Sequence, residues 1–301
     1  MKLRLGMAQR EALVFYVLIS PWVIGFLVFS LGPILASLGI SFSQYDIVQP
    51  LKWIGLNNYR DMISDELFWQ SLKVTAVYTL FGVPLGIIAA LFLSSLLNQR
   101  IPAMPVFRTM FYLPSVISGV AVSLLWIWLL NPTFGLINYF LRVAFGVRGP
   151  KWLLSPQWVL PAFVLMSLWT VGGSTIIYLA ALQGVPSELY EAAQLDGANA
   201  WRRFRHVTLP MISPVILFTF ITGIIGSFQV FTQAYVMTGG GPHYASLFYG
   251  LYIFQNAFRK FKMGYASALA WVLFIIILGL SLVTFRASAN RVHYQAGEDR
   301  G

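Results

Sequence analysis

The chain has 301 residues, of which 58% are hydrophobic and only 10% are charged. Soluble domains have about 45–50% apolar and about 25% charged residues, so this composition excludes an ordinary soluble protein and predicts a polytopic membrane protein. The absence of cysteine excludes disulfides and thiolate metal sites. A formal charge of +10 suits an anionic membrane surface, whereas no basic tract with interleaved aromatic residues indicates nucleic-acid binding.

A membrane-spanning helix needs about 20 predominantly apolar residues, and six segments of the chain qualify. They are 13–41, 74–97, 111–130, 158–182, 212–237 and 266–285. The predicted fold class is all-α, a single transmembrane domain over residues 1–301 with six transmembrane helices between the end segments 1–12 and 286–301. Lys2 and Arg4 precede the first segment as in a signal peptide, but its apolar stretch is too long and has no clean cleavage site.

Lysine and arginine indicate the orientation of a membrane protein, because they are enriched on the cytoplasmic side. Here they are divided almost evenly between the two sides of the predicted spans, so we infer the orientation from the residues that flank the first span. Lys2, Arg4 and Arg10 precede it, and no basic residue follows it before Lys52. We therefore expect both termini and the 186–210 segment on the cytoplasmic side.

Two loops on the opposite side carry local signals. Trp53 and Tyr59 flank a turn in the first loop, which predicts an amphipathic interfacial helix with both rings at the lipid headgroups. The second loop, residues 131–157, contains the turn signals Asn131-Pro132 and Gly135. It is basic, with Arg142, Arg148 and Lys151. This loop is predicted to be either a solvated connection or a contact for an external partner.

Neutral polar and aromatic side chains gather in the fourth and fifth spans. Such side chains suit a sugar, which needs hydrogen bonds and apolar stacking but no counter-ion. They also serve as contacts between transmembrane helices, and both interpretations stay open. The candidates for a substrate pathway are Trp169, Thr170, Ser174, Tyr178, Ser227, Gln229, Gln233 and Tyr235.

The six spans contain no Asp, Glu, Lys, Arg or His. An ionisable residue inside the membrane is the usual mark of a proton relay or an ion-coupled carrier, so this pattern argues against a proton symporter. The sequence also has no Walker A motif, no nucleophile motif and no metal-ligand spacing. It therefore predicts neither ATP hydrolysis nor other catalysis by this chain.

A polar segment, residues 186–210, separates the fourth and fifth spans. Ser187 is the predicted N-cap of a short helix, and Gly197 ends that helix because glycine tolerates the left-handed conformation. Ala192 and Ala193 give the helix a small face, which favours close approach of another surface in the helix-in-groove mode. A second short helix is predicted after the glycine. An ordinary loop helix on the cytoplasmic side is the alternative interpretation.

The same segment carries a spaced signature of Glu-Ala-Ala, Asp-Gly-Ala, phenylalanine and Leu-Pro. Its residues are Glu191, Ala192, Ala193, Asp196, Gly197, Ala198, Phe204, Leu209 and Pro210. This signature resembles the EAA loop of bacterial ABC importer permeases. Segments 53–59, 238–242 and 264–268 resemble corresponding parts of the carbohydrate (maltose-type) class.

The resemblance implies that 186–210 is a coupling helix that docks into an ATP-hydrolysing subunit. It implies a permease subunit that forms half of a pathway for a sugar or oligosaccharide in the bacterial or archaeal inner membrane. Implied partners are a second homologous permease as a heterodimer, two ATPase subunits and an extracytoplasmic substrate-binding protein. This chain would hold no cofactor and would not be an enzyme, since ATP and Mg would be bound by the ATPases. A glycerol-phosphate importer and a stand-alone secondary sugar carrier are the alternatives.

Overall fold

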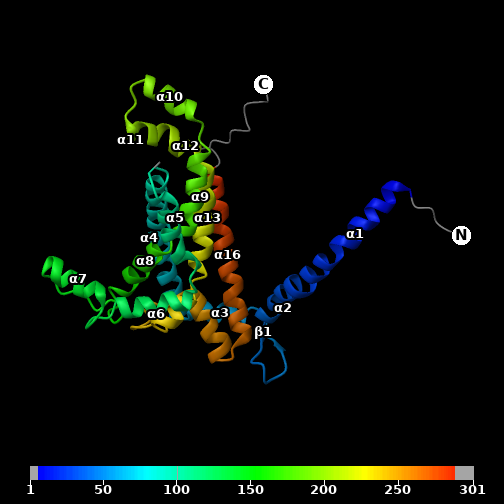
Figure 1. Ribbon diagram of the computed structural model, residues 1–301. Coiled ribbons are helices and arrows are strands. Elements are labelled where there is room, and N and C mark those ends of the chain that lie inside the picture. Colours follow the sequence, from blue (N-terminus) through cyan, green and yellow to red (C-terminus); the bar gives the residue numbers. More distant parts are fainter. Residues whose placement is uncertain (1–5, 100, 289–301) are drawn as a thin grey trace. The chain divides into compact units, whose positions relative to one another are not determined.

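The computed structural model describes residues 6–99 and 101–288, and nearly all of its regular structure is helical (Figure 1). Most of the predicted 286–301 tail and part of the 1–12 segment therefore lie outside the described residues.

The α-helices and strands follow in chain order, with π-helical turns labelled η. They are α1 (Met7–Phe26), η1 (Leu27–Leu31), α2 (Gly32–Ser41), β1 (Ser43–Gln44), β2 (Lys52–Trp53), α3 (Asn57–Ser64), α4 (Glu66–Leu97), α5 (Met104–Val116), α6 (Gly119–Leu129), α7 (Leu136–Phe145), α8 (Val159–Trp169), α9 (Gly172–Gln183), α10 (Ser187–Leu195), α11 (Ala200–Arg203), η2 (Phe204–Thr208), α12 (Leu209–Met211), α13 (Ser213–Phe228), α14 (Thr232–Met237), α15 (Tyr249–Phe254), η3 (Gln255–Arg259) and α16 (Met263–Ser288).

Backbone contacts divide the chain into two compact units. The first consists of Met1–Ser64 and Ile253–Val272, and the second of Asp65–Tyr252 and Leu273–Gly301. All of the predicted site residues belong to the second unit.

The first unit contains a small departure from the all-α prediction. Strands β1 and β2 pair antiparallel, with Ser43 opposite Trp53. The buried amide of Asn58 donates to the backbone oxygens of Ser41 at 2.8 Å and of Ser43 at 2.9 Å, which fixes α3 against this ribbon. The Tyr59 hydroxyl lies 2.8 Å from the Ser41 hydroxyl, so Tyr59 packs within the unit while Trp53 is exposed.

The long helix α4 is the centre of the second unit and packs against α8, α9 and α13. Small residues allow this close packing: a Cβ added to Gly223 on α13 would lie 3.0 Å from the Val83 side chain on α4. Neutral hydroxyls join the same helices, since the Thr79 and Ser227 hydroxyls lie 2.8 Å apart. In membrane proteins such hydrogen bonds contribute only about 0.6 kcal/mol each, so small-residue packing carries much of the association.

The predicted spans appear in the structure as four apolar helical stretches long enough to cross a membrane and two bent pairs. The stretches are Met7–Ser41, Glu66–Leu97, Ser213–Met237 and Met263–Ser288, and the third is interrupted between α13 and α14. The pair Val159–Trp169 and Gly172–Gln183 is bent by 48°. The predicted span over 111–130 is not one continuous helix, because Met104–Val116 and Gly119–Leu129 meet at 99°. Pro114 lies inside the end of α5, and proline removes a helical hydrogen bond and clashes with the preceding turn.

Candidate functional site

Residues 186–210 form a compact arm between α9 and α13, which we call the coupling element after the role that the Glu-Ala-Ala resemblance implies. It consists of α10, α11, η2 and the start of α12. Figure 1 shows α10 and α11 at one end of the second unit, beyond α9 and α12, while α6 and α7 lie toward its other end. Two short helices joined at a glycine were predicted from the sequence, and α10 and α11 confirm them.

The glycine joint of the coupling element is a Schellman turn. Gly197 has φ +73°, the left-handed conformation that its position after the helix predicted. The amide of Gly197 donates to the Gln194 oxygen at 3.0 Å, and that of Ala198 donates to the Ala193 oxygen at 2.9 Å. The turn therefore satisfies carbonyls at the end of α10 and fixes the direction in which the chain leaves it.

The two arms of the element are joined by side chains. The Tyr190 hydroxyl of α10 lies 3.0 Å from the Thr208 hydroxyl of η2. Asn199 caps α11, since its side chain accepts from the Arg202 amide at 2.9 Å. The prediction that Ser187 caps α10 is wrong: Pro186 occupies the N-cap position, because its ψ of 134° is extended while Ser187 is already helical.

The outer surface of the coupling element is left uncovered by the part of the chain that the structure describes. No residue of α10 is buried, and Glu191, Ala192 and Asp196 are all exposed. Ala193 and Ala198 are half-buried, as are Phe204, Leu209 and Pro210 on the second arm. Two large apolar side chains stand outside, with Leu195 90% exposed and Trp201 66% exposed.

Leu195 was not among the predicted site residues. The sequence did contain a signal for it, because Leu195 is a large apolar residue immediately before the Asp196-Gly197 helix end. In the structure its side chain is not covered by the described residues. An exposed carboxylate beside small and large apolar groups can bind a protein groove with one polar contact and apolar burial around it.

A cavity of about 320 Å³ lies where three helix breaks of the second unit meet. Ile117 comes from the α5–α6 break, Thr170 from the α8–α9 break and Val230 from the α13–α14 break. Irregular backbone at membrane depth is tolerated where it is buried in protein or lines a cavity. The position of the three breaks at a cavity is therefore consistent with their lying inside a membrane.

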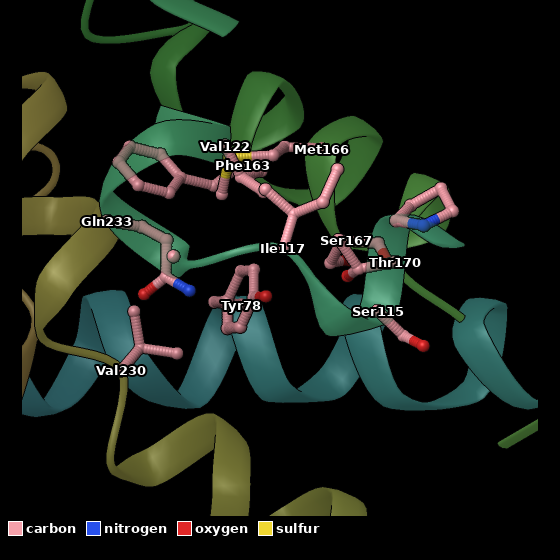
Figure 2. Close-up of a pocket in the computed structure, with 12 residues that line it drawn as sticks. Tyr78, Ser115, Ile117, Val122, Phe163, Met166, Ser167, Thr170, Val230 and Gln233 are labelled. Carbon is pink, nitrogen blue, oxygen red and sulfur yellow. The ribbon is translucent and has the colours of Figure 1, made fainter. Parts of the chain in front are cut away.

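The cavity wall carries neutral polar groups. Figure 2 shows Tyr78 rising from α4, with Gln233 on one side and Ser115, Ser167 and Thr170 toward the other. None of the lining residues is Asp, Glu, Lys, Arg or His. The wall can offer hydroxyl and amide hydrogen bonds and aromatic contact, and it has no charge for an ionic ligand.

The structure separates the predicted pathway residues into three groups. Thr170 and Gln233 line the cavity of about 320 Å³, whereas Ser174 and Ser227 line a second cavity of about 200 Å³. The two cavities share Tyr78, Ser167 and Val230 in their walls.

The remaining pathway candidates lie elsewhere. Tyr178 is fully buried and its hydroxyl hydrogen-bonds the Thr219 hydroxyl, which makes it a contact between α9 and α13. Trp169 meets Trp126 edge-on at 6.2 Å between ring centroids. Gln229 is the exposed C-cap of α13, and the exposed Tyr235 stacks on Phe231.

Three polar cavity residues were missed from the sequence: Tyr78, Ser115 and Ser167. Tyr78 satisfied the criterion used for the fourth and fifth spans, a polar aromatic residue inside an apolar span. Ser115 follows Pro114, where the helix is about to end. Within residues 6–99 and 101–288, no group of three or more His, Asp or Glu side chains could hold a metal ion.

Comparison of the sequence with known proteins identifies a family for this chain. The family model described as "Binding-protein-dependent transport system inner membrane component" matches residues 82–291. The probable ABC transporter permease protein YesP of Bacillus subtilis (strain 168) is 43% identical, over 97% of this chain and 95% of YesP. The lactose transport system permease protein LacF of Rhizobium radiobacter is 36% identical, over 92% of this chain and 94% of LacF.

The fold also has a solved counterpart. A chain in the crystal structure of a bacterial alginate ABC transporter, in complex with an alginate pentasaccharide-bound periplasmic protein, superposes with a TM-score of 0.82. The match covers 93% of this chain and 96% of that one at 23% identity, which shows the shared fold. The chain belongs to the family of binding-protein-dependent transport system inner membrane components, the ABC transporter permeases that its Glu-Ala-Ala signature predicted.

Proposed function

We propose that this chain is a permease subunit of an ABC importer for a sugar or oligosaccharide, and that it couples the translocation pathway to ATP hydrolysis on a partner. The observation that carries the proposal is the coupling element, a stiff arm whose outer surface is uncovered. A helix of a folded chain normally buries an apolar stripe, yet α10 buries no residue and leaves Leu195 90% exposed.

The coupling element is suited to transmit movement. In the proposed complex, α10 lies in a groove of the ATPase, with Ala192 and Ala193 permitting close approach and Glu191 providing a polar contact. The Schellman turn at Gly197 and the Tyr190–Thr208 hydrogen bond keep the two arms from folding separately. A push on α10 therefore reaches α12 and α13, which continue directly from the second arm.

The substrate pathway that we propose runs through the cavity at the helix breaks. α13 lines the adjoining second cavity with Thr219 and Ser227 and ends two residues before Val230, so movement of the coupling element reaches the α13–α14 break in the cavity wall. Tyr78, Thr170 and Gln233 would bind sugar hydroxyls, and the neutral wall fits an uncharged carbohydrate. The relative LacF is a lactose permease, which supports a carbohydrate class for this chain.

The proposed assembly follows the family. Both units of the chain form one transmembrane domain with six spans, the two bent pairs each counting as one span. The chain pairs with a second homologous permease and two ATPase subunits, and it receives substrate from an extracytoplasmic binding protein. It lies in the inner membrane of a bacterium or archaeon with both termini and the coupling element in the cytoplasm. ATP and Mg are bound by the ATPase subunits, and this chain has no catalytic role of its own.

Two rival functions make different demands on the molecule. A glycerol-phosphate importer would need positive charge for its phosphate, and the walls of both cavities described above contain none. A stand-alone sugar carrier would have no use for an uncovered arm outside its spans, and the six apolar segments carry no residue for a coupling ion.

Co-purification tests the proposal. The full-length chain is expressed with the ATPase and permease subunits of its cell, and the complex is isolated through a tag on this chain. Wild type should bring down an ATPase, and Glu191→Lys should lose most of it because it reverses a charge at the docking surface. Asp61→Lys is the matched control, since it makes the same charge reversal at an exposed position of α3, outside the coupling element. Recovery of the chain without any ATPase, in wild type as in the variants, would support a stand-alone carrier.

A further inference from the structure

Helix α7 leaves one apolar face outward. Leu136, Phe140 and Val143 are 53%, 60% and 66% exposed, and their spacing places them on one face together with Tyr139. The one buried residue of α7 is the polar Asn138, with Ile137 and Leu141 half-buried beside it. The described residues thus cover the side of α7 that carries Asn138 and leave the opposite, wholly apolar and aromatic face open.

This orientation is fixed by a network around Asn138. Its amide nitrogen lies 3.2 Å from the Pro150 oxygen and 3.4 Å from the Pro132 oxygen, and its amide oxygen accepts from the Trp152 indole at 2.7 Å. Gly149 lies so close that an added Cβ would be 2.0 Å from that amide oxygen. α7 cannot rotate its apolar face inward without breaking these contacts.

Length and charge identify what the outward face meets. A helix of 10 residues is about 15 Å long, half of the roughly 30 Å hydrocarbon core, so α7 is too short to span and fits an interfacial position. The surrounding loop 131–157 contains Arg142, Arg148 and Lys151 and no acidic residue. This charge is complementary to anionic phospholipid headgroups.

The flank of the apolar face is also built for a membrane surface. The Arg142 guanidinium lies 5.8 Å from the centre of the Tyr139 ring, beside the exposed stripe. Arginine at the edge of an apolar face can extend to phosphate while its stem stays on the apolar side, and tyrosine favours the same interface. A protein groove would need no such basic border.

We propose that α7 lies in the plane of the membrane surface, with Phe140 and its neighbours inserted at the acyl boundary and Arg142 on anionic phospholipid headgroups. This anchor holds α6 from its C-terminal side, because only residues 130–135 separate the two helices. α6 begins at the 99° break that lines the cavity, so the anchor restrains one wall of the proposed pathway. The inference does not depend on which substrate is carried.

Single-cysteine labelling tests the inference, because the native chain has no cysteine to remove. Phe140→Cys carries a nitroxide in the full-length chain, reconstituted with its co-purifying subunits into nanodiscs of phosphatidylcholine and phosphatidylglycerol. Thr133→Cys, exposed in the turn before α7, is the matched control. We expect a several-fold higher ratio of oxygen to water-soluble nickel collisions at position 140 than at position 133. Quenching by lipid spin labels should follow the same order.

Three other outcomes would overturn the inference. Equal collision ratios at the two positions would place the face in water. A label at 140 that is shielded from both oxygen and nickel would show a protein partner instead of lipid. A high ratio that stays unchanged both when phosphatidylglycerol is omitted and in Arg142→Gln would remove the role of anionic headgroups. Thermal unfolding of each variant identifies any that is misfolded, and Val143→Cys then supplies a second label on the same face.

Discussion

Substitutions at Gly197 test whether the coupling element touches a partner. Gly197 has φ +73°, and no atom of residues 6–99 and 101–288 lies within 4 Å of a Cβ built there. Alanine therefore meets no neighbour and should lose about 1 kcal/mol through backbone strain alone, roughly a fivefold change in a local equilibrium. Phenylalanine has the same backbone strain and also finds open space next to its Cβ. In the isolated chain the two variants should be nearly equal in thermal stability.

In the assembled importer the two variants should differ. A docked ATPase would occupy the space beside the Gly197 turn, and a phenylalanine side chain there would hold the two surfaces apart. We expect Gly197→Ala to keep most of the sugar uptake per ATP in proteoliposomes. We expect Gly197→Phe to hydrolyse ATP without matching uptake, or to lose the ATPase from the complex.

Gly55 provides the matched control for this experiment. It lies between β2 and α3 with φ +62°, and a Cβ built there also has open space around it, but it belongs to neither the coupling element nor α7. Gly55→Ala and Gly55→Phe should reproduce the backbone strain and leave the uptake per ATP unchanged. If wild type, Gly197→Ala and Gly197→Phe all gave the same uptake per ATP, the coupling element would be an ordinary loop and the reasoning above would be refuted.

The other predictions separate docking, pathway and packing. Leu195→Ser should change the stability of the isolated chain by less than about 0.5 kcal/mol, as for other surface positions, but should weaken ATPase co-purification. Gln233→Ala should raise the half-saturating sugar concentration for uptake, whereas Gln229→Ala, outside the cavity walls, should not; equal effects would remove the cavity from the pathway. Tyr178→Phe should lower stability by about 0.6 kcal/mol with unchanged sugar dependence, since it deletes an interhelical hydrogen bond. Asn199→Ala should cost about 1 kcal/mol locally and loosen α11, which hydrogen exchange of that segment would report.

The two short helices and the glycine turn of the coupling element could be predicted from the sequence because they depend on neighbouring residues. A left-handed glycine after a short helix depends only on neighbouring residues, and Gly197 has that conformation. The apolar segments were readable for the same reason, since hydropathy is summed along the chain. Hydropathy does not report direction, however, so the 99° turn after Val116 stayed hidden inside a uniformly apolar stretch. Pro114 was the one local signal of that break.

The cavity could not be predicted in full because its walls come from distant helices. Gln233 and Tyr178 looked alike from the sequence, as polar residues in apolar spans. Their roles differ because Tyr178 has Thr219 opposite it, 41 residues away, while Gln233 faces a cavity wall shared with Tyr78 of α4. The packing of whole helices determines which polar residue hydrogen-bonds another helix and which lines a cavity. Neither the periodicity nor the composition of the sequence carries that information.

The meeting of three helix breaks also affects how a ligand would be recognised. The first N–H groups and the last carbonyls of a helix have no partner within that helix, so the helix ends at these breaks can offer main-chain donors and acceptors to a ligand. A sugar hydroxyl can bond to such groups without any dedicated side chain. Recognition of this kind depends on the positions of main-chain groups. Replacing one side chain at a time would therefore change the selectivity for sugars by small steps. Related permeases could then accept different sugars while keeping the same three breaks.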